Sequence, residues 1–208
     1  MVNAATFKGR NIISMREFDR AEIDFILDTA DDMVKLEQEG SDLLKGKVMA
    51  ALFFEPSTRT RLSFKSAMNR LGGGVIGFAT PAGSSVEKGE SLMDTIRTVS
   101  QYSDIITMRH PDEMSSRNAV KVASVPVING LSDYEHPCQC LADLLTVLER
   151  KGRLQGLKIA YLGDGNNVAH SLIFAAAKTG LHLTLAIPYG YEPDAEVVKK
   201  AQNEAAQT

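Results

Sequence analysis

The sequence predicts an α/β protein, built as a doubly wound parallel sheet followed by an incomplete second α/β domain. Strand-like and helix-like segments alternate along almost all of the 208 residues. This alternation is typical of parallel sheets with helices on both faces. Residues 48–54 form a continuous apolar run, as expected of a strand buried on both sides. Polar residues then gather just after several predicted strands, where ligands bind in such sheets.

The first domain is predicted over residues 1–135. Ser14 and Glu17 have the spacing of a capping box, so a helix is expected to follow them through Leu36. Helical spacing of apolar residues and short β-prone runs predict the remaining elements in turn. They are a strand at 48–54, a helix at 59–71, a strand at 74–79, a helix around 92–99, a strand at 104–108, a helix at 113–123 and a strand at 125–129.

A long helix over 137–150 is expected to cross to the second domain, predicted over residues 151–208. A strand at 157–162 ends at a glycine-containing turn, and a helix at 168–179 follows. A strand at 182–187 and a charged helix from about 194 complete the pattern.

Composition narrows the function classes. The chain has 44% hydrophobic and 24% charged residues with a net charge of -3, which describes an ordinary globular protein. Neither nucleic acid nor a membrane surface is expected as a partner, and no apolar run is long enough to span a bilayer. Cys138 and Cys140 are too close for a typical disulfide and lack the second pair of a zinc site. A reducing, cytoplasmic location is the simplest expectation.

The run from Ser57 to Arg61, Ser-Thr-Arg-Thr-Arg, is the most informative motif. Pro56 separates the buried strand from a helix whose N-cap is expected to be Ser57 or Thr58. Such an opening turn offers free N–H groups, hydroxyls and guanidiniums, a combination that suits a phosphate dianion. Because Arg59 and Arg61 are two positions apart, they point to different sides, so we expect Arg59 toward the ligand and Arg61 toward nearby carboxylates. In isolation, an ordinary capped helix remains the competing interpretation.

Other polar residues are expected at the same edge of the sheet. Arg109 follows the strand at 104–108, while His136 and Gln139 open the long helix. Together these three side chains could contact a carbonyl oxygen and an amide nitrogen beside a phosphate. Ser84 and Lys88 lie in a glycine-flanked loop that could be a closing lid or simply a solvated turn.

The turn Gly163-Asp164-Gly165-Asn166-Asn167 resembles a dinucleotide fingerprint only weakly, since the third glycine and the acidic residue are missing. Its asparagines suit either a small polar ligand or a tight strand-to-helix turn. A dinucleotide-binding domain is therefore kept as a rival hypothesis.

Taken together, these motifs resemble the aspartate and ornithine carbamoyltransferase family. The run Ser57–Arg61 matches the family's carbamoyl-phosphate signature, and Arg109 and the His136-Pro137-x-Gln139 motif match its other hallmarks. The resemblance covers essentially the whole chain and implies the following roles. The phosphate would be held by Ser57, Thr58, Arg59 and Thr60, the carbonyl oxygen by Thr60, Arg109 and His136, and the carbamoyl amide by Gln139.

The resemblance divides between the two branches of the family. The segments 84–90, 94–97 and 108–111 look like an aspartate carbamoyltransferase, in which residues matching Ser84 and Lys88 enter the active site of a neighbouring subunit. The segments 136–139 and 163–171 look like the ornithine branch, and Asn167 matches an ornithine-type contact. Aspartate is expected as the acceptor by a narrow margin, with ornithine as the alternative.

The resemblance implies a homotrimer that binds carbamoyl phosphate and an amino-acid acceptor, and it implies no metal and no organic cofactor. Family members continue well beyond the point where this chain stops, so the acceptor half is expected to be partial. A non-catalytic fragment that binds carbamoyl phosphate is the alternative from a different class.

Overall fold

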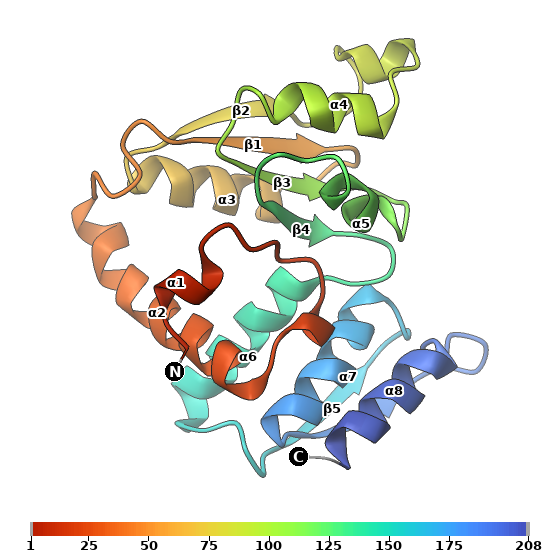
Figure 1. Cartoon of the computed structure of the whole chain (residues 1–208). Helices are drawn as coiled ribbons and strands as arrows, with labels where there is room; N and C mark the ends of the chain where they lie inside the picture. Colours follow the sequence, from red (N-terminus) through yellow and green to blue (C-terminus); the bar gives the residue numbers. More distant parts are fainter. Residues whose placement is uncertain (1, 207–208) are drawn as a thin grey trace.

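The protein has an α/β fold with two parallel sheets (Figure 1). The structure, a computed structural model, describes residues 2–206 apart from the side chains at positions 35, 37 and 38. The first sheet contains β1 (Val48–Phe53), β2 (Gly74–Phe78), β3 (Ile105–Arg109) and β4 (Val127–Leu131). The second sheet belongs to a partial second domain and contains β5 (Lys158–Leu162) and β6 (His182–Ala186).

Apart from the short α1, which the sequence did not predict, the helices follow the predicted order. They are α1 (Ala4–Phe7), α2 (Arg20–Glu39), α3 (Arg59–Arg70), α4 (Leu92–Val99), α5 (Ser115–Val120), α6 (Pro137–Lys151), α7 (Asn167–Thr179) and α8 (Ala195–Ala205). Two 3-10 turns, η1 (Met15–Glu17) and η2 (Ser85–Lys88), precede α2 and α4. Figure 1 shows α6 running between the four-stranded sheet and the second one.

The four-stranded sheet has the order β2-β1-β3-β4, and all its strands are parallel. From β1 the chain proceeds through α3 to β2 on one side, whereas from β3 it proceeds to β4 on the other side. The connections after β1 and β3 therefore diverge from two adjacent strands. In a doubly wound sheet this switch point leaves a crevice at the carboxyl ends of the two strands.

Both faces of β1 are buried, which explains its unbroken apolar sequence. On one face Ala51 and Phe53 pack with Met68 of α3. On the other face Ala50 and Leu52 belong to a cluster that includes residues of α4 and α5. The alternation along β1 thus confirms the predicted doubly wound arrangement, with α3 and α4 on opposite sides of the sheet (Figure 1).

The start of α2 corrects one prediction. Ser14 does not open the long helix: it caps the short turn η1 by accepting a hydrogen bond from the Arg16 amide. The capping box belongs to Asp19 and Glu22, and α2 starts at Arg20. The reason is a distant contact, since the buried carboxylate of Glu135 accepts hydrogen bonds from the Ser14 hydroxyl and holds that residue away from α2.

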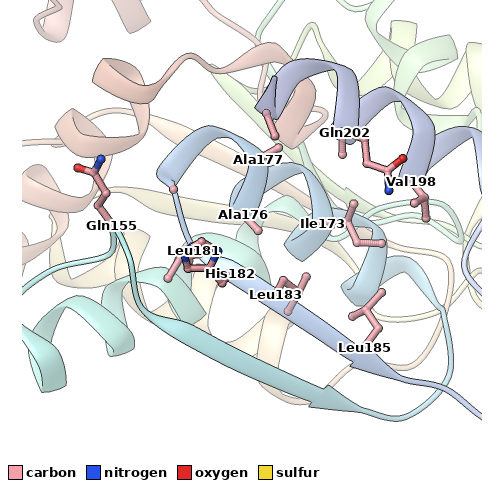
Figure 2. A pocket seen from close by; sticks show the side chains of 13 residues that line it. Gln155, Ile173, Ala176, Ala177, Leu181, His182, Leu183, Leu185, Val198 and Gln202 are labelled. Carbon is pink, nitrogen blue, oxygen red and sulfur yellow. The ribbon is translucent and has the colours of Figure 1, made fainter. Parts of the chain in front are cut away.

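The second sheet is small and has two free edges in the described part of the chain. Along β6, α7 and α8 lies an apolar cavity of about 530 Å³. Figure 2 shows Ile173, Leu183, Leu185 and Val198 facing this space from the three elements. None of the residues that line it is an acid, a lysine or an arginine, so this cavity does not suit a phosphate.

Candidate functional site

The opening turn of α3 lies at the carboxyl end of β1. Thr58 is the N-cap residue of α3, as predicted, but among the described residues no side chain accepts a capping hydrogen bond there. The competing interpretation of this turn as an ordinary capped helix is therefore wrong. The first N–H groups of a helix have no intrahelical partners, so at α3 they remain available to a bound anion.

Arg109 enters the crevice from the last position of β3. It pairs with Phe53 at the end of β1, and its carbonyl accepts a hydrogen bond from the Phe54 amide. The register with β4 shifts between Met108 and Arg109, so the strand pairing is irregular at this end of β3. The Nε of Arg109 lies 3.2 Å from Oε2 of Glu55, so the guanidinium is held beside the β1–α3 connection.

His136 is the N-cap of α6, and Pro137 follows at the first helical position. Only 6% of His136 is exposed, and its amide donates to Oγ of Ser171 at 2.9 Å. Burial, reinforced by the positive charge of Arg109, lowers the pKa of His136 to about 4. The imidazole is therefore neutral at pH 7. Its Nδ1 accepts a hydrogen bond from the Gln139 amide at 3.4 Å, which leaves the proton on Nε2.

Gln139 is the third residue of α6, and its side chain is directed toward Asp143. The Nε2 of Gln139 donates to Oδ1 of Asp143 at 2.8 Å. Burial raises the pKa of the Asp143 carboxyl above its ordinary value, while the hydrogen bond from Gln139 acts in the opposite direction. The motifs in the sequence did not identify Asp143. Its i,i+4 spacing from Gln139, which places both on one helix face, was the available signal.

These groups meet in one cavity of about 540 Å³, a size usual for small-molecule sites. Its lining comes from the β1–α3 connection and the start of α3, the ends of β3 and β4, the first two turns of α6 and the start of α7. The residues are Pro56, Ser57, Thr58, Arg59, Thr60, Arg109, Leu131, His136, Gln139, Asp143 and Val168. Two guanidiniums and one carboxylate line the cavity, and the guanidinium of Arg109 is also paired with Glu55, which lies outside the lining.

Three predicted site residues do not line this cavity: Ser84, Lys88 and Asn167. Ser84 donates to the Pro81 carbonyl at 2.6 Å, and Lys88 is exposed at the end of η2. Figure 1 shows that this segment projects beyond α4, away from the sheet. Asn167 is the first residue of α7, next to Val168, and its Nδ2 donates to the Ser132 carbonyl at 3.0 Å.

Arg61 also lies outside the cavity lining, so the two arginines of the motif separate as predicted. The expected carboxylate partner of Arg61 is not found among the described residues, where no ion pair joins it to an acid. The thiols are free: Cys138 contacts the Asn129 carbonyl and Cys140 is buried. In the same part of the chain, no cluster of three or more His, Cys, Asp or Glu side chains is suited to hold a metal.

The turn at 163–167 is a tight strand-to-helix connection rather than a nucleotide site. The side chain of Asn166 accepts hydrogen bonds from the amides of Val168 and Ala169, which caps α7 with the protein's own oxygen. A Cβ on Gly165 would lie 2.1 Å from the backbone nitrogen of Pro193, so the chain itself fills the space beside this turn. The diphosphate of a dinucleotide would need free amides at the start of α7 and open space beside the turn, and the protein itself occupies both.

Comparison with known proteins identifies the family. Residues 10–149 match the model of the aspartate/ornithine carbamoyltransferase carbamoyl-P binding domain, and residues 155–208 match the Asp/Orn binding domain of the same family. The chain belongs to the aspartate/ornithine carbamoyltransferase family.

Individual relatives come from both branches of this carbamoyltransferase family. An ornithine carbamoyltransferase of Thermococcus kodakarensis is 46% identical over 202 residues, covering 96% of this chain and 64% of the relative. The aspartate carbamoyltransferase catalytic subunit of the same organism is 51% identical over 188 residues, covering 88% of this chain and 60% of the relative. The chain thus spans about two thirds of the length of the curated relatives it matches.

Solved structures agree with this assignment. The ornithine carbamoyltransferase of Pyrococcus furiosus superposes with a TM-score of 0.89 at 45% identity, over 96% of this chain and 64% of that one. An aspartate transcarbamoylase of Trypanosoma cruzi in complex with carbamoyl phosphate gives a TM-score of 0.92 at 37% identity, over 99% of this chain and 69% of that one. No helix among residues 2–206 is long and apolar enough to cross a membrane.

Proposed function

We propose that the protein transfers a carbamoyl group from carbamoyl phosphate to the amino group of an amino acid. The supporting observation is the shared cavity, in which the uncapped start of α3 meets Arg59, Arg109 and neutral His136. Residues 1–135 would form the carbamoyl-phosphate domain and residues 151–208 part of the acceptor domain, with α6 joining them.

The phosphate group would dock at the first turn of α3. The first turn of α3 has no side-chain cap, and its positive dipole end lies at the cavity that Ser57, Thr58 and Thr60 line. Arg59 supplies a charge-assisted contact to the phosphate oxygens. This arrangement stabilises the departing phosphate as the bond between carbon and oxygen breaks.

The carbonyl oxygen of carbamoyl phosphate would lie among Thr60, Arg109 and His136. Negative charge builds on this oxygen when an amine attacks the carbonyl carbon, and fixed donors stabilise it. The neutral imidazole suits this role because its Nδ1 is engaged with the Gln139 amide, so Nε2–H is the donor. Each such donor is worth about 2.7–4 kcal/mol of barrier in comparable sites.

The remaining steps need only groups that the chain and the substrates provide. Gln139 would contact the carbamoyl amide, and the attacking amine would form the new C–N bond. The phosphate leaves with the electron pair of the broken C–O bond and can take up the proton lost by the amine. Ser84 and Lys88, which lie outside this chain's cavity, would act in the neighbouring site of a homotrimer.

Aspartate is the acceptor we propose first. The support is the segment around η2, which lies outside this chain's own cavity and ends in the exposed Lys88, as expected for the aspartate branch. The aspartate carbamoyltransferase relative also has 51% identity to this chain over its matched region.

Ornithine is the second candidate acceptor. The turn at 163–167 has no arginine for a second substrate carboxylate, and Asn167 stands beside the cavity residue Val168. Relatives named ornithine carbamoyltransferase also match a larger share of this chain, 96% against 88%. Incubating the chain with carbamoyl phosphate and either amino acid, and quantifying carbamoyl-aspartate and citrulline, separates the two. Product from ornithine alone would reject our first choice, and absence of both products would favour the non-catalytic fragment.

The substitution Arg59→Ala tests the phosphate site itself. Hydrogen bonds to charged groups contribute about 1.5–3 kcal/mol, so the affinity for carbamoyl phosphate should fall about tenfold or more. Arg61→Ala is the matched control, since Arg61 is on the same helix but outside the cavity. Titration calorimetry measures both variants, and circular dichroism verifies their folding. Equal affinities of the two variants would contradict the proposed phosphate site.

A further inference from the structure

The side-chain amide of Gln139 is oriented by a carboxylate that no family motif in the sequence marked. Gln139 and Asp143 are four residues apart on α6 and both line the site cavity. The Nε2 of Gln139 lies 2.8 Å from Oδ1 of Asp143. An ionised carboxylate only accepts hydrogen bonds, so it must face the NH₂ end of the amide.

This contact decides which end of the amide is left for a ligand. Asp143 lies one helical turn beyond Gln139, farther from His136 along α6. With its nitrogen directed at Asp143, the amide leaves its oxygen Oε1 unpaired by that carboxylate, on the side away from it. An oxygen in this position accepts a hydrogen bond from a ligand N–H group, whereas it makes no hydrogen bond with a methyl group.

We propose that Asp143 is a positioning residue that orients Gln139 so that the site selects a phosphorylated ligand carrying an amide NH₂ over the same ligand carrying a methyl group. The inference rests on the proposed function, because it takes carbamoyl phosphate as the ligand of this cavity. Gln139 is exposed in the structure, so without Asp143 its side chain moves freely and must be ordered when the ligand binds.

The expected effect follows from that ordering. Fixing a flexible side chain on binding costs about 0.5–1.5 kcal/mol, which corresponds to about fivefold in affinity. Asp143→Ala should therefore weaken binding of the amide ligand about fivefold. It should leave the methyl ligand nearly unchanged, because that ligand makes no hydrogen bond to Gln139.

A pair of stable phosphonates provides the test. Phosphonoacetamide and acetonylphosphonate share a phosphonate and a carbonyl, and they differ only in NH₂ against CH₃. Calorimetric titration of the full chain with each compound gives the preference for NH₂ in wild type, Asp143→Ala and Asp143→Asn. Asparagine keeps an acceptor for Nε2 but permits both amide orientations, so it should lower the preference by at most about twofold.

Glu149→Ala is the matched control, an exposed carboxylate removed from the same helix. Selective weakening of phosphonoacetamide binding in Asp143→Ala, with rescue by asparagine, supports the inference. Equal weakening of both ligands would show a merely structural role, and an unchanged preference in Asp143→Ala would also overturn the inference. If Asp143→Ala does not fold, Asp143→Asn provides the test instead. A preference for the NH₂ ligand over the CH₃ ligand that falls below half of the wild-type value in Asp143→Asn would overturn the inference. Failure of wild type to bind carbamoyl phosphate would instead reject the proposed function and this inference with it.

Discussion

The protonation of His136 links the candidate site to the stability of the whole chain. Burial and the charge of Arg109 lower its pKa from 6.5 to about 4. Between these two pH values the unfolded chain binds a proton at this histidine and the folded chain does not. Stability is therefore full above pH 6.5 and falls as the pH decreases toward 4. The shift corresponds to about 3 kcal/mol.

His136→Asn isolates this contribution. Asparagine is a favourable N-cap, so the start of α6 should persist while the titrating group is removed. Urea unfolding at pH 7, 6, 5 and 4, followed by circular dichroism, gives the free energy of unfolding of each protein. We expect the wild type to lose about 3 kcal/mol more than the variant over this range.

The exposed His182 provides the control for this experiment. His182→Asn should follow the wild-type curve, since this side chain is exposed on β6 (His182–Ala186) and lies outside the candidate site. Parallel curves for wild type and His136→Asn would refute the argument. In that event His136 would be protonated in the folded protein at pH 5, and a neutral Nε2–H donor would no longer be a sound description of the site.

Three further predictions concern stability. Gly165→Ala places a Cβ 2.1 Å from the backbone nitrogen of Pro193 and should cost about 1–3 kcal/mol in thermal unfolding. Gly74→Ala, whose Cβ has no neighbour closer than 3.9 Å, is its control. Glu135→Ala removes the buried partner of η1 and should cost about 3 kcal/mol in urea unfolding, against at most about 0.5 kcal/mol for Glu149→Ala. Amides of β5 and β6 should exchange hydrogen faster than those of β1 and β3, because a two-stranded sheet with free edges opens locally; equal protection would contradict this.

Local sequence predicted the strands because each is a short apolar run with a clear break after it. The run at 48–54 ends where Pro56 and the polar motif begin, and β1 ends at Phe53. Strand order is a different matter. In the structure β1 lies between β2 and β3, which creates the switch point. This order depends on how the helices pack on the two faces of the sheet. Alternation of elements alone does not encode that order.

The mistaken start of α2 has a similar cause. Ser14 and Glu17 satisfy the local pattern of a capping box. However, the Ser14 hydroxyl donates its hydrogen bond to Glu135, which lies more than one hundred residues away in the sequence. Asp143 was missed for the opposite reason: an acidic residue on a helix usually belongs to a solvated face. Its importance becomes visible only when the cavity shows which face of α6 is turned inward.

The two helices that follow β1 and β5 show what separates a binding turn from a structural one. Both begin after a strand with small polar residues, and both would present N–H groups to an anion. In α7 the Asn166 side chain occupies that place, whereas α3 has no such cap among the described residues. An absent N-cap lowers helix stability by about 1 kcal/mol. A phosphate docked at α3 would supply the missing acceptors, so the stability that the free protein lacks at this turn becomes part of the binding energy.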